Sequence, residues 1–324
     1  MPKKHFLILL LIGIPLLVKS QQTAVYSQYM DNAFVFNSAL AGDVGLTKFS
    51  LISKQQWMGM DLAPRTFSLS AQTRLLLRKF QIKSRPLKKN KMLATRSGRV
   101  GVGLNVTNDR NGYFQNTTLT GSYAYHIPFT NSQLSLGLSG SLSQLKIDKS
   151  GIVFREAGDP KEAFVEEPAY APDIGVGIQY KDFESYYFGF SISNIIQTNI
   201  RFGNTTLNYN LKRHYYLMAG YRKSFTNTSY IDLTTLAKST ELLMPQIDLS
   251  AKVVIKELYW LGLSYRSTTT AIFLAGVYFR NFLVGYAFDY DFNSFNKVTV
   301  GSHELNLSLW FGDSSRRYKW IRRF

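Results

Sequence analysis

Short segments of alternating apolar and polar residues follow one another along the chain from Gly45 onward. In the clearest segment, one face carries Leu134, Leu136, Leu138 and Leu142, and the other carries Ser135, Gly137, Ser139, Ser141 and Ser143. A period of two places the two sets on opposite sides of a β-strand. The same pattern recurs in segments that begin at Val100, Asp173, Tyr259 and Leu305.

The alternation predicts an all-β protein with about fourteen strands. The expected strand centres are Leu51, Leu69, Leu104, Ser122, Leu138, Val176, Phe190, Leu217, Leu233, Leu249, Leu263, Leu274, Val284 and Leu307. An even number of antiparallel strands is what a closed single-chain barrel needs when both chain ends lie on the same side of a membrane. The alternation is least regular near Leu51 and Leu233.

The polar faces of these strands distinguish a barrel from a soluble β-sandwich. They consist mostly of Ser, Gly, Thr and Asn, whereas a sheet face in water usually carries more charge. Tyr and Phe are frequent near the expected strand ends, as at Tyr123, Tyr125, Tyr186–Phe190, Tyr215, Tyr216, Phe279, Phe282 and Tyr286–Tyr290. Aromatic residues at both interfaces are typical of an outer-membrane barrel. The pattern therefore favours a transmembrane antiparallel β-barrel.

The connections between the expected strands also alternate in length. One set is short and comprises Pro128–Ser132, Lys181–Ser185, Thr226–Thr228, Lys256–Glu257 and Arg280–Asn281. The other set includes the longer segments Asp148–Pro172, Gln197–Asn210, Lys238–Pro245 and Asp289–His303. Short periplasmic turns and long outer loops are typical of these barrels. The basic segment Arg78–Gly98 is long yet falls on the periplasmic side, so it is either a partner-binding loop or a sign that the register differs there.

The N-terminus has the pattern of a signal peptide. Lys3 and Lys4 precede the apolar run Phe6–Val18, which is too short for a membrane-spanning helix, and small residues precede a cleavage site at Ser20/Gln21. We therefore expect a signal peptide at 1–20, an N-terminal periplasmic or plug segment at 21–44, the barrel at 45–311 and a basic tail at 312–324.

Composition limits the chemistry of the exported chain. Cysteine is absent, which excludes disulfides, thiolate metal sites and cysteine nucleophiles. The formal net charge is +17, and removal of the leader with its three lysines leaves +14. Such a charge would indicate nucleic acid in a cytosolic protein, but outside the cytoplasm anionic lipid or an acidic protein is the expected counterpart.

No catalytic or metal-binding motif is present. The four histidines lack the spacing of a metal site, there is no Gly-x-Ser-x-Gly motif, and Gly101-Val102-Gly103 is not followed by a third glycine. Glycines within a strand more often admit a bulky neighbour. The acidic residues between Glu156 and Glu167 are read as a solvated loop. We expect no enzymatic activity, no cofactor and no metal.

Ordered sequence blocks then resemble a known family. The blocks are Tyr26-Ser27-Gln28-Tyr29-Met30, Asn37-Ser38-Ala39, Gln56-Trp57-Met58-Gly59, Ala63-Pro64-Arg65-Thr66, Tyr123–Pro128, Trp260–Arg266, Gly285–Asp289 and Gly301–Leu305. In this order they resemble the PorP/SprF family of type IX secretion system proteins of Bacteroidota. Two positions depart from the family pattern, because Ser38 stands where proline is usual and Leu62 where glycine is common.

The resemblance implies a non-enzymatic outer-membrane component of protein secretion. Family members assist the export or surface retention of cargo with a C-terminal sorting domain, and some support the adhesins of gliding motility. The resemblance also implies a periplasmic peptidoglycan-binding lipoprotein as partner and, through it, the motor-linked ring. The alternatives are a diffusion channel for small solutes, an outer-membrane enzyme and a soluble sandwich.

Two groups of residues are the candidate functional sites. We expect the segment 21–41 to fill the lumen, since a Ser- and Gly-lined barrel of this size would otherwise leave a pore. The candidate plug or partner-binding residues are Tyr26, Gln28, Tyr29, Asn37, Trp57, Arg266, His303 and Glu304. The candidate periplasmic partner contacts are Arg316, Arg317, Lys319, Arg322 and Arg323 in the tail.

Overall fold

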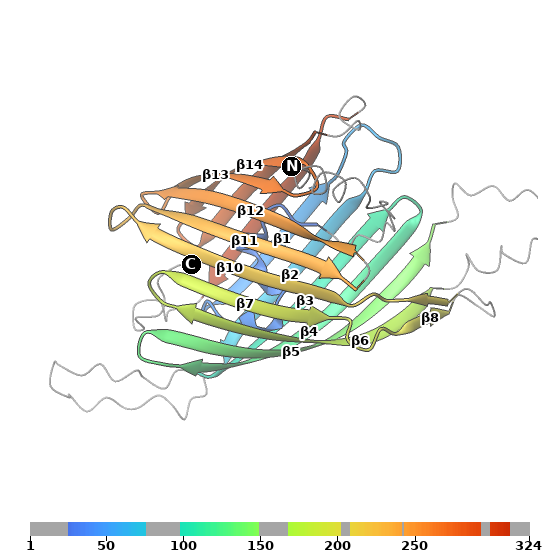
Figure 1. Ribbon diagram of the computed structural model, residues 1–324, viewed down its shortest axis with the longest axis horizontal. Helices are drawn as coiled ribbons and strands as arrows, with labels where there is room; N and C mark the ends of the chain where they lie inside the picture. The colour runs from blue at the N-terminus through green and yellow to red at the C-terminus, as the bar shows by residue number, and fades with distance from the viewer. Residues whose placement is uncertain are drawn as a thin grey trace, which may run out of the picture.

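The computed structural model describes residues 25–75, 98–148, 168–201, 208–241, 243–292 and 299–311, and fourteen of its strands form one closed antiparallel barrel (Figure 1). These strands are β1 (Thr47–Gln55), β2 (Arg65–Leu75), β3 (Val100–Asn111), β4 (Phe114–Pro128), β5 (Ser132–Ile147), β6 (Ala169–Asp182), β7 (Tyr186–Ser193), β10 (His214–Ser224), β11 (Tyr230–Thr240), β12 (Leu243–Ile255), β13 (Tyr259–Arg266), β14 (Thr270–Phe279), β15 (Phe282–Asp291) and β16 (Ser302–Phe311). Every expected strand centre lies within one of them, so the predicted fold class and strand number are confirmed.

The barrel closes between its first and last strands. β1 pairs with β2 on one side and with β16 on the other, in a register that runs from Thr47 opposite Phe311 to Gln55 opposite His303. Two further short strands, β8 (Asn199–Arg201) and β9 (Asn208–Asn210), form a separate hairpin in the connection between β7 and β10. Closure gives the backbone groups of the strands partners within the protein, which a lipid environment requires.

The outer wall of the barrel is apolar. In β6 burial alternates residue by residue, with Ile174, Val176 and Ile178 facing outward and exposed. On β13, Leu261 and Leu263 are 63% and 61% exposed, and similar side chains follow on almost every strand. So large a contiguous apolar surface is incompatible with water and matches the hydrocarbon core of a bilayer.

Exposed aromatic side chains border this apolar wall at both ends of the barrel. At the end with the short turns, here called the turn rim, they are Phe49, Tyr123, Tyr125, Phe129, Tyr180, Tyr186, Phe188, Tyr221, Phe225, Tyr259, Phe279, Phe282 and Phe311. At the other end, here called the loop rim, they are Phe67, Phe114, Tyr170, Tyr265, Phe273, Tyr290 and Phe292. Tyr187 and Tyr216 depart from the expectation, because they face inward and pack in the lumen.

The largest difference from the expected connections lies between β11 and β12. Lys238–Pro245 was expected as a long loop, yet β11 and β12 continue to pair until Thr240 lies opposite Leu243. A register shift between Lys238 and Thr240 interrupts the alternation there, which hides the strand ends from a pattern of period two. The expected basic loop Arg78–Gly98 lies almost entirely outside the described residues.

At both positions that depart from the family pattern, the backbone conformation also suits the residue that is usual in the family. Leu62 has φ +55°, a left-handed conformation that glycine adopts without strain. Ser38 is the first residue of the 3₁₀ helix η3 (Ser38–Leu40), after an Asn37 in extended conformation that caps it. Proline suits the first position of a helix and an extended preceding residue, so this backbone fits either residue.

Candidate functional site: the plugged lumen

The N-terminal segment 25–46, here called the plug, lies inside the barrel, where Figure 1 shows its turns enclosed by strands. It contains three 3₁₀ helices, η1 (Tyr29–Asp31), η2 (Ala33–Val35) and η3. Tyr29 is 1% exposed and Ala39 is fully buried. No helix among the described residues is long and apolar enough to span a membrane.

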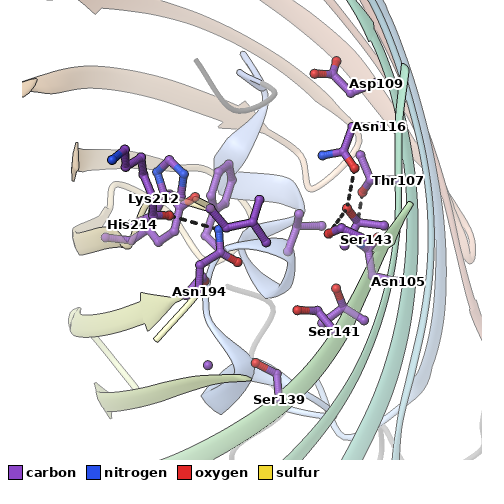
Figure 2. A pocket seen from close by; sticks show the side chains of 18 of the residues that line it. Asn105, Thr107, Asp109, Asn116, Ser139, Ser141, Ser143, Asn194, Lys212 and His214 are labelled. Atoms are coloured by element: carbon purple, nitrogen blue, oxygen red, sulfur yellow. Dashed lines mark hydrogen bonds between the residues drawn. The ribbon is translucent and has the colours of Figure 1, made fainter. Parts of the chain in front are cut away.

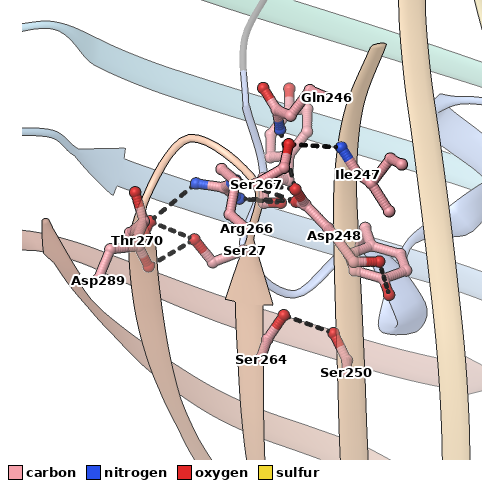
Figure 3. Close-up of polar contacts among 12 residues, drawn as sticks. Ser27, Gln246, Ile247, Asp248, Ser250, Ser264, Arg266, Ser267, Thr270 and Asp289 are labelled. Atoms are coloured by element: carbon pink, nitrogen blue, oxygen red, sulfur yellow. Dashed lines mark hydrogen bonds and ion pairs between the residues drawn. The ribbon is translucent and has the colours of Figure 1, made fainter. Parts of the chain in front are cut away.

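The first anchor of the plug is formed at Ser27 and Gln28. The Glu304 carboxylate on β16 accepts hydrogen bonds from the backbone nitrogens of Ser27 at 2.6 Å and of Gln28 at 2.9 Å. The Ser27 hydroxyl donates to the Asp289 carboxylate on β15 at 2.6 Å (Figure 3). Hydrogen bonds to a buried carboxylate are stronger than neutral ones, so these contacts fix the start of the plug.

Two cations balance the carboxylates of the first anchor. Lys54 on β1 lies 2.7 Å from Asp289 and 3.6 Å from Glu304. Arg266 on β13 pairs with Asp248 at 3.0 Å and with Asp289 at 3.4 Å (Figure 3). All five side chains are almost completely buried. A buried charge needs a partner, so the loss of any member leaves the others poorly compensated.

The second anchor is Asp31, at the end of η1. Its carboxylate pairs with Lys252 on β12 at 2.8 Å and accepts a hydrogen bond from the Tyr278 hydroxyl on β14 at 3.3 Å. The Lys48 ammonium on β1 donates to the Asp31 carbonyl oxygen. The plug is therefore attached here to strands on both sides of the first anchor.

The third anchor is Asp43, at the end of the plug. Its carboxylate pairs with Lys181 on β6 at 2.7 Å and accepts from Gln133 on β5 at 2.8 Å. Burial alone would raise the pKa of the Asp43 carboxyl, but the positive charge of Lys181, its hydrogen bond to Asp43 and the positive charge of Arg74 outweigh it and hold the pKa below its ordinary value. β6 and β15 lie seven strands apart in the ring of fourteen, so the plug is held from opposite sides of the barrel.

His126 on β4 also holds the plug, through its ring nitrogens. Its Nε2 lies 2.9 Å from the carbonyl oxygen of Ala41, which can only accept. Nε2 must therefore carry the proton, and Nδ1 accepts from Gln133 at 3.2 Å and from Ser135 at 2.8 Å. His126 therefore makes a specific contact with the plug.

Glycines of the barrel wall make room for the plug backbone. A Cβ atom at Gly101 would lie 1.9 Å from the carbonyl oxygen of Ala41, and one at Gly137 would lie 2.1 Å from the nitrogen of Ala39. At Gly103 a Cβ atom would meet the Phe34 ring at 2.4 Å. These distances are far below any van der Waals contact, so the lumen accepts the plug only because these positions carry no side chain.

The plug also packs through aromatic rings. Tyr26 lies edge-on against Phe36 at 5.7 Å between ring centroids, and Phe36 contacts Tyr216 of β10 at 5.4 Å. Tyr29 and Met218 complete a buried cluster around them. Aromatic pairs at such distances add to the apolar burial that keeps the plug in place.

The structure brings six of the eight candidate residues together. Tyr26, Gln28, Tyr29 and Asn37 belong to the plug, whereas Arg266 and Glu304 belong to the wall that contacts it. Trp57 lies in the connection between β1 and β2, where its indole donates to Asp291 at 3.0 Å.

His303 has a different position from the one expected of a plug contact. It lies between the lumen-facing Ser302 and Glu304, and its Nδ1 is 2.6 Å from the hydroxyl of Tyr286. It therefore faces the outer wall, because neighbouring residues of a strand point to opposite faces. The five candidate contacts of the tail, from Arg316 to Arg323, lie outside the described residues.

Several charged residues of the lumen were not predicted from the sequence. Lys54, Lys181, Lys252 and Asp289 all lie on the polar side of their strands, which was expected to carry few charges. A signal was present, since each falls in the polar phase of an alternating segment, where a lipid-facing charge would be costly. The alternation shows which side chains face the lumen, but it does not show which of these side chains contact each other.

A cavity of about 490 Å³ lies between the plug and the wall, and it reaches the loop rim (Figure 2). Hydroxyl and amide side chains of β3, β4 and β5 line one side of it, among them Thr107, Asn116, Thr118, Ser141 and Ser143. The plug and β10 supply aromatic rings on the other side. Among the described residues, no group of three or more His, Cys, Asp or Glu side chains is placed to bind a metal ion.

The closed barrel with its apolar belt, aromatic borders and plugged polar lumen defines an outer-membrane β-barrel. The model of the type IX secretion system membrane protein PorP/SprF matches residues 18–309, and the chain belongs to this family. It is thus an outer-membrane component of the type IX secretion system.

Comparison of whole structures finds other barrels. The toluene transporter TbuX of Ralstonia pickettii has a TM-score of 0.47 at 10% identity, and the comparison covers 86% of this chain and 93% of that one. The outer membrane protein Omp33 of Acinetobacter baumannii has a TM-score of 0.46 at 8% identity and covers 82% of this chain and 100% of that one. No curated protein matches the sequence of this chain.

Proposed function

We propose that the protein is a non-enzymatic docking component that binds exported cargo at the loop rim and a periplasmic peptidoglycan-binding lipoprotein at the turn rim. The observation that carries this proposal is the plug, which is attached to opposite sides of the lumen. A lumen occupied in this way suits a platform for proteins better than the alternative, a diffusion channel for small solutes.

The shape of the two rims supports the assignment of the partners. The described turns between strands at the turn rim are short, whereas the loop rim carries the long connections 148–168, 194–213 and 292–301. In barrels of this class the short turns face the periplasm, so the loop rim would face outward, where cargo with a sorting domain is retained. The basic tail 312–324 follows β16 at the turn rim and would meet the lipoprotein.

Affinity purification from native outer membranes tests the proposal. The full chain should recover a peptidoglycan-binding lipoprotein, and reversal of the tail charges at Arg316, Arg317, Lys319, Arg322 and Arg323 should lose it. Reversal of Lys223, near the end of β10, and of Lys256, directly after β12, is a control that changes the charge of the turn rim without touching the tail. Equal recovery of the lipoprotein by the tail variant would contradict the assignment of the tail.

A second purification tests the outer partner. Exchange of the loop 148–168 for a Gly/Ser linker of equal length should lose the exported cargo and keep the lipoprotein. If both partners remain, the cargo does not bind this loop.

A further inference from the structure

We propose that the cavity at the loop rim is a binding site for neutral oligosaccharide. It holds about 490 Å³, within the usual range of ligand sites. One side of the cavity is lined by hydroxyl and amide groups, and the other side is lined by aromatic rings. This combination suits a sugar, because the hydroxyls of a sugar exchange hydrogen bonds and its apolar ring face packs on an aromatic ring.

The polar side of the cavity comes from three neighbouring strands. Thr107 on β3, Asn116 on β4, and Ser141 and Ser143 on β5 point into it (Figure 2). Thr118 on β4 also lines it. Asn116, Thr118 and Ser143 form one network, in which the Thr118 hydroxyl lies 3.4 Å from the Asn116 amide oxygen and 2.9 Å from the Ser143 hydroxyl. Each hydroxyl can both donate and accept, so the network has capacity for a polyhydroxylated ligand.

The opposite side supplies rings and polar atoms without partners. Phe36 of the plug and Tyr216 of β10 present their rings, and His214 lies beside them. Within the described part of the chain, the buried Nδ1 of His214 and the buried hydroxyl of Ser38 have no hydrogen-bond partner. Both residues line the cavity, and buried polar atoms of this kind are normally satisfied.

Other ligand classes fit the cavity less well. The charged residues of its lining are Asp109, Lys146 and Lys212, which mix both signs and do not select an anion. β3, β4 and β5 are each paired on both sides, so they offer no free edge to an extended peptide. An apolar solute would leave the hydroxyl wall without partners.

Saturation-transfer NMR and calorimetry on the full chain test this proposal, in a detergent without a sugar head group. The probes are soluble neutral hexasaccharides and the neutral polysaccharide of the outer membrane from the source organism. Binding of either probe supports the shared chemistry, and the probe that binds identifies the source. No saturable binding up to about 10 mM would overturn the proposal.

A pair of variants locates the binding. Thr118→Val with Ser143→Ala removes two hydroxyls that bond each other, and it should weaken sugar binding about three- to tenfold. Thr73→Val, which removes a paired hydroxyl outside the cavity, should leave binding unchanged. Unchanged binding in the double variant, or displacement of the sugar by an uncharged peptide, would overturn the assignment.

Discussion

At the scale of single residues, the plug fits into the lumen because three glycines of the wall have no side chain. Gly101, Gly103 and Gly137 admit backbone or ring atoms of the plug where any side chain would overlap them. Other glycines of the wall have open space around the position of a Cβ atom, as at Gly121 on β4 and Gly140 on β5. All of these positions carry glycine, but only the first three face atoms of the plug.

This difference predicts the outcome of two matched substitutions. Gly137→Ala places a methyl group against the backbone of Ser38 and Ala39, which cannot rotate away, and should destabilise the plugged state by about 1–3 kcal/mol. Since the chain has no cysteine, the maleimide labelling rate of an Ala33→Cys reporter in the plug measures the release. Gly140→Ala should leave that rate unchanged, and equal rates in both variants would contradict the role of Gly137.

A second residue-scale prediction concerns Glu304, which accepts two backbone hydrogen bonds from the plug. Glu304→Gln replaces one acceptor oxygen with a donor and removes a charge near Lys54. The free energy of unfolding should fall by about 1.5–3 kcal/mol. Urea unfolding in detergent measures it.

The control for this variant is Glu241→Gln. Glu241 forms a half-exposed pair with Arg213, so its loss should cost less than about 1 kcal/mol. If the free energy of unfolding falls by a similar amount in both variants, the buried Glu304 does not stabilise the protein more than an exposed ion pair does.

At the scale of elements, the plug is a segment with little internal structure of its own. Its three 3₁₀ helices have three residues each, and such turns have poor hydrogen-bond geometry. The plug therefore takes its conformation from the three anchors and from the aromatic cluster around Tyr26 and Phe36. Loss of one anchor should loosen the nearest part of the plug first.

The third anchor predicts a dependence on pH. The pKa of Asp43 is lower in the folded protein than in the unfolded chain, so its carboxylate stabilises the plugged state at neutral pH. This stabilisation is lost as the pH falls from the pKa of Asp43 in the unfolded chain, 3.8, through its lower pKa in the folded protein. Maleimide reacts with the thiolate, which is scarce in acid. The labelling rate of the Ala33→Cys reporter, divided at each pH by the rate of the same cysteine in the unfolded chain, should therefore rise in acid.

Asp43→Asn separates this contribution from other acid effects. The variant should label faster than the parent at neutral pH, and the two rates should converge in acid. A constant ratio of the two rates across the pH range would show that Asp43 does not stabilise the plug through its charge.

At the scale of the whole molecule, a closed wall and an anchored plug together determine how the protein meets solutes. The wall leaves a polar lumen, and the plug occupies it from one side of the ring to the other. The protein should thus conduct ions poorly in a planar bilayer, although its barrel is wide enough to hold a peptide segment.

Removal of the plug should reverse this behaviour. A chain that lacks residues 21–44 but keeps residues 1–20 should show a stable increase in single-channel conductance, because the polar lumen is then open to water. A control barrel with Gly140→Ala should conduct like the parent. Unchanged conductance after the deletion would mean that the plug does not close the lumen.

The sequence by itself determined the barrel, its fourteen strands and its family, since alternation is a local pattern with a period of two and the motifs are contiguous. It also predicted that Tyr26, Gln28 and Glu304 belong to functional segments. Which other wall residues hold the plug, and which groups pair with each other, was decided only by the tertiary structure. The bond from Ser27 to Glu304 joins residues 277 positions apart, and it depends on the ring order of the strands and on the path of the plug. A strand's own pattern tells which side chains face the lumen, but not which of them meet across it.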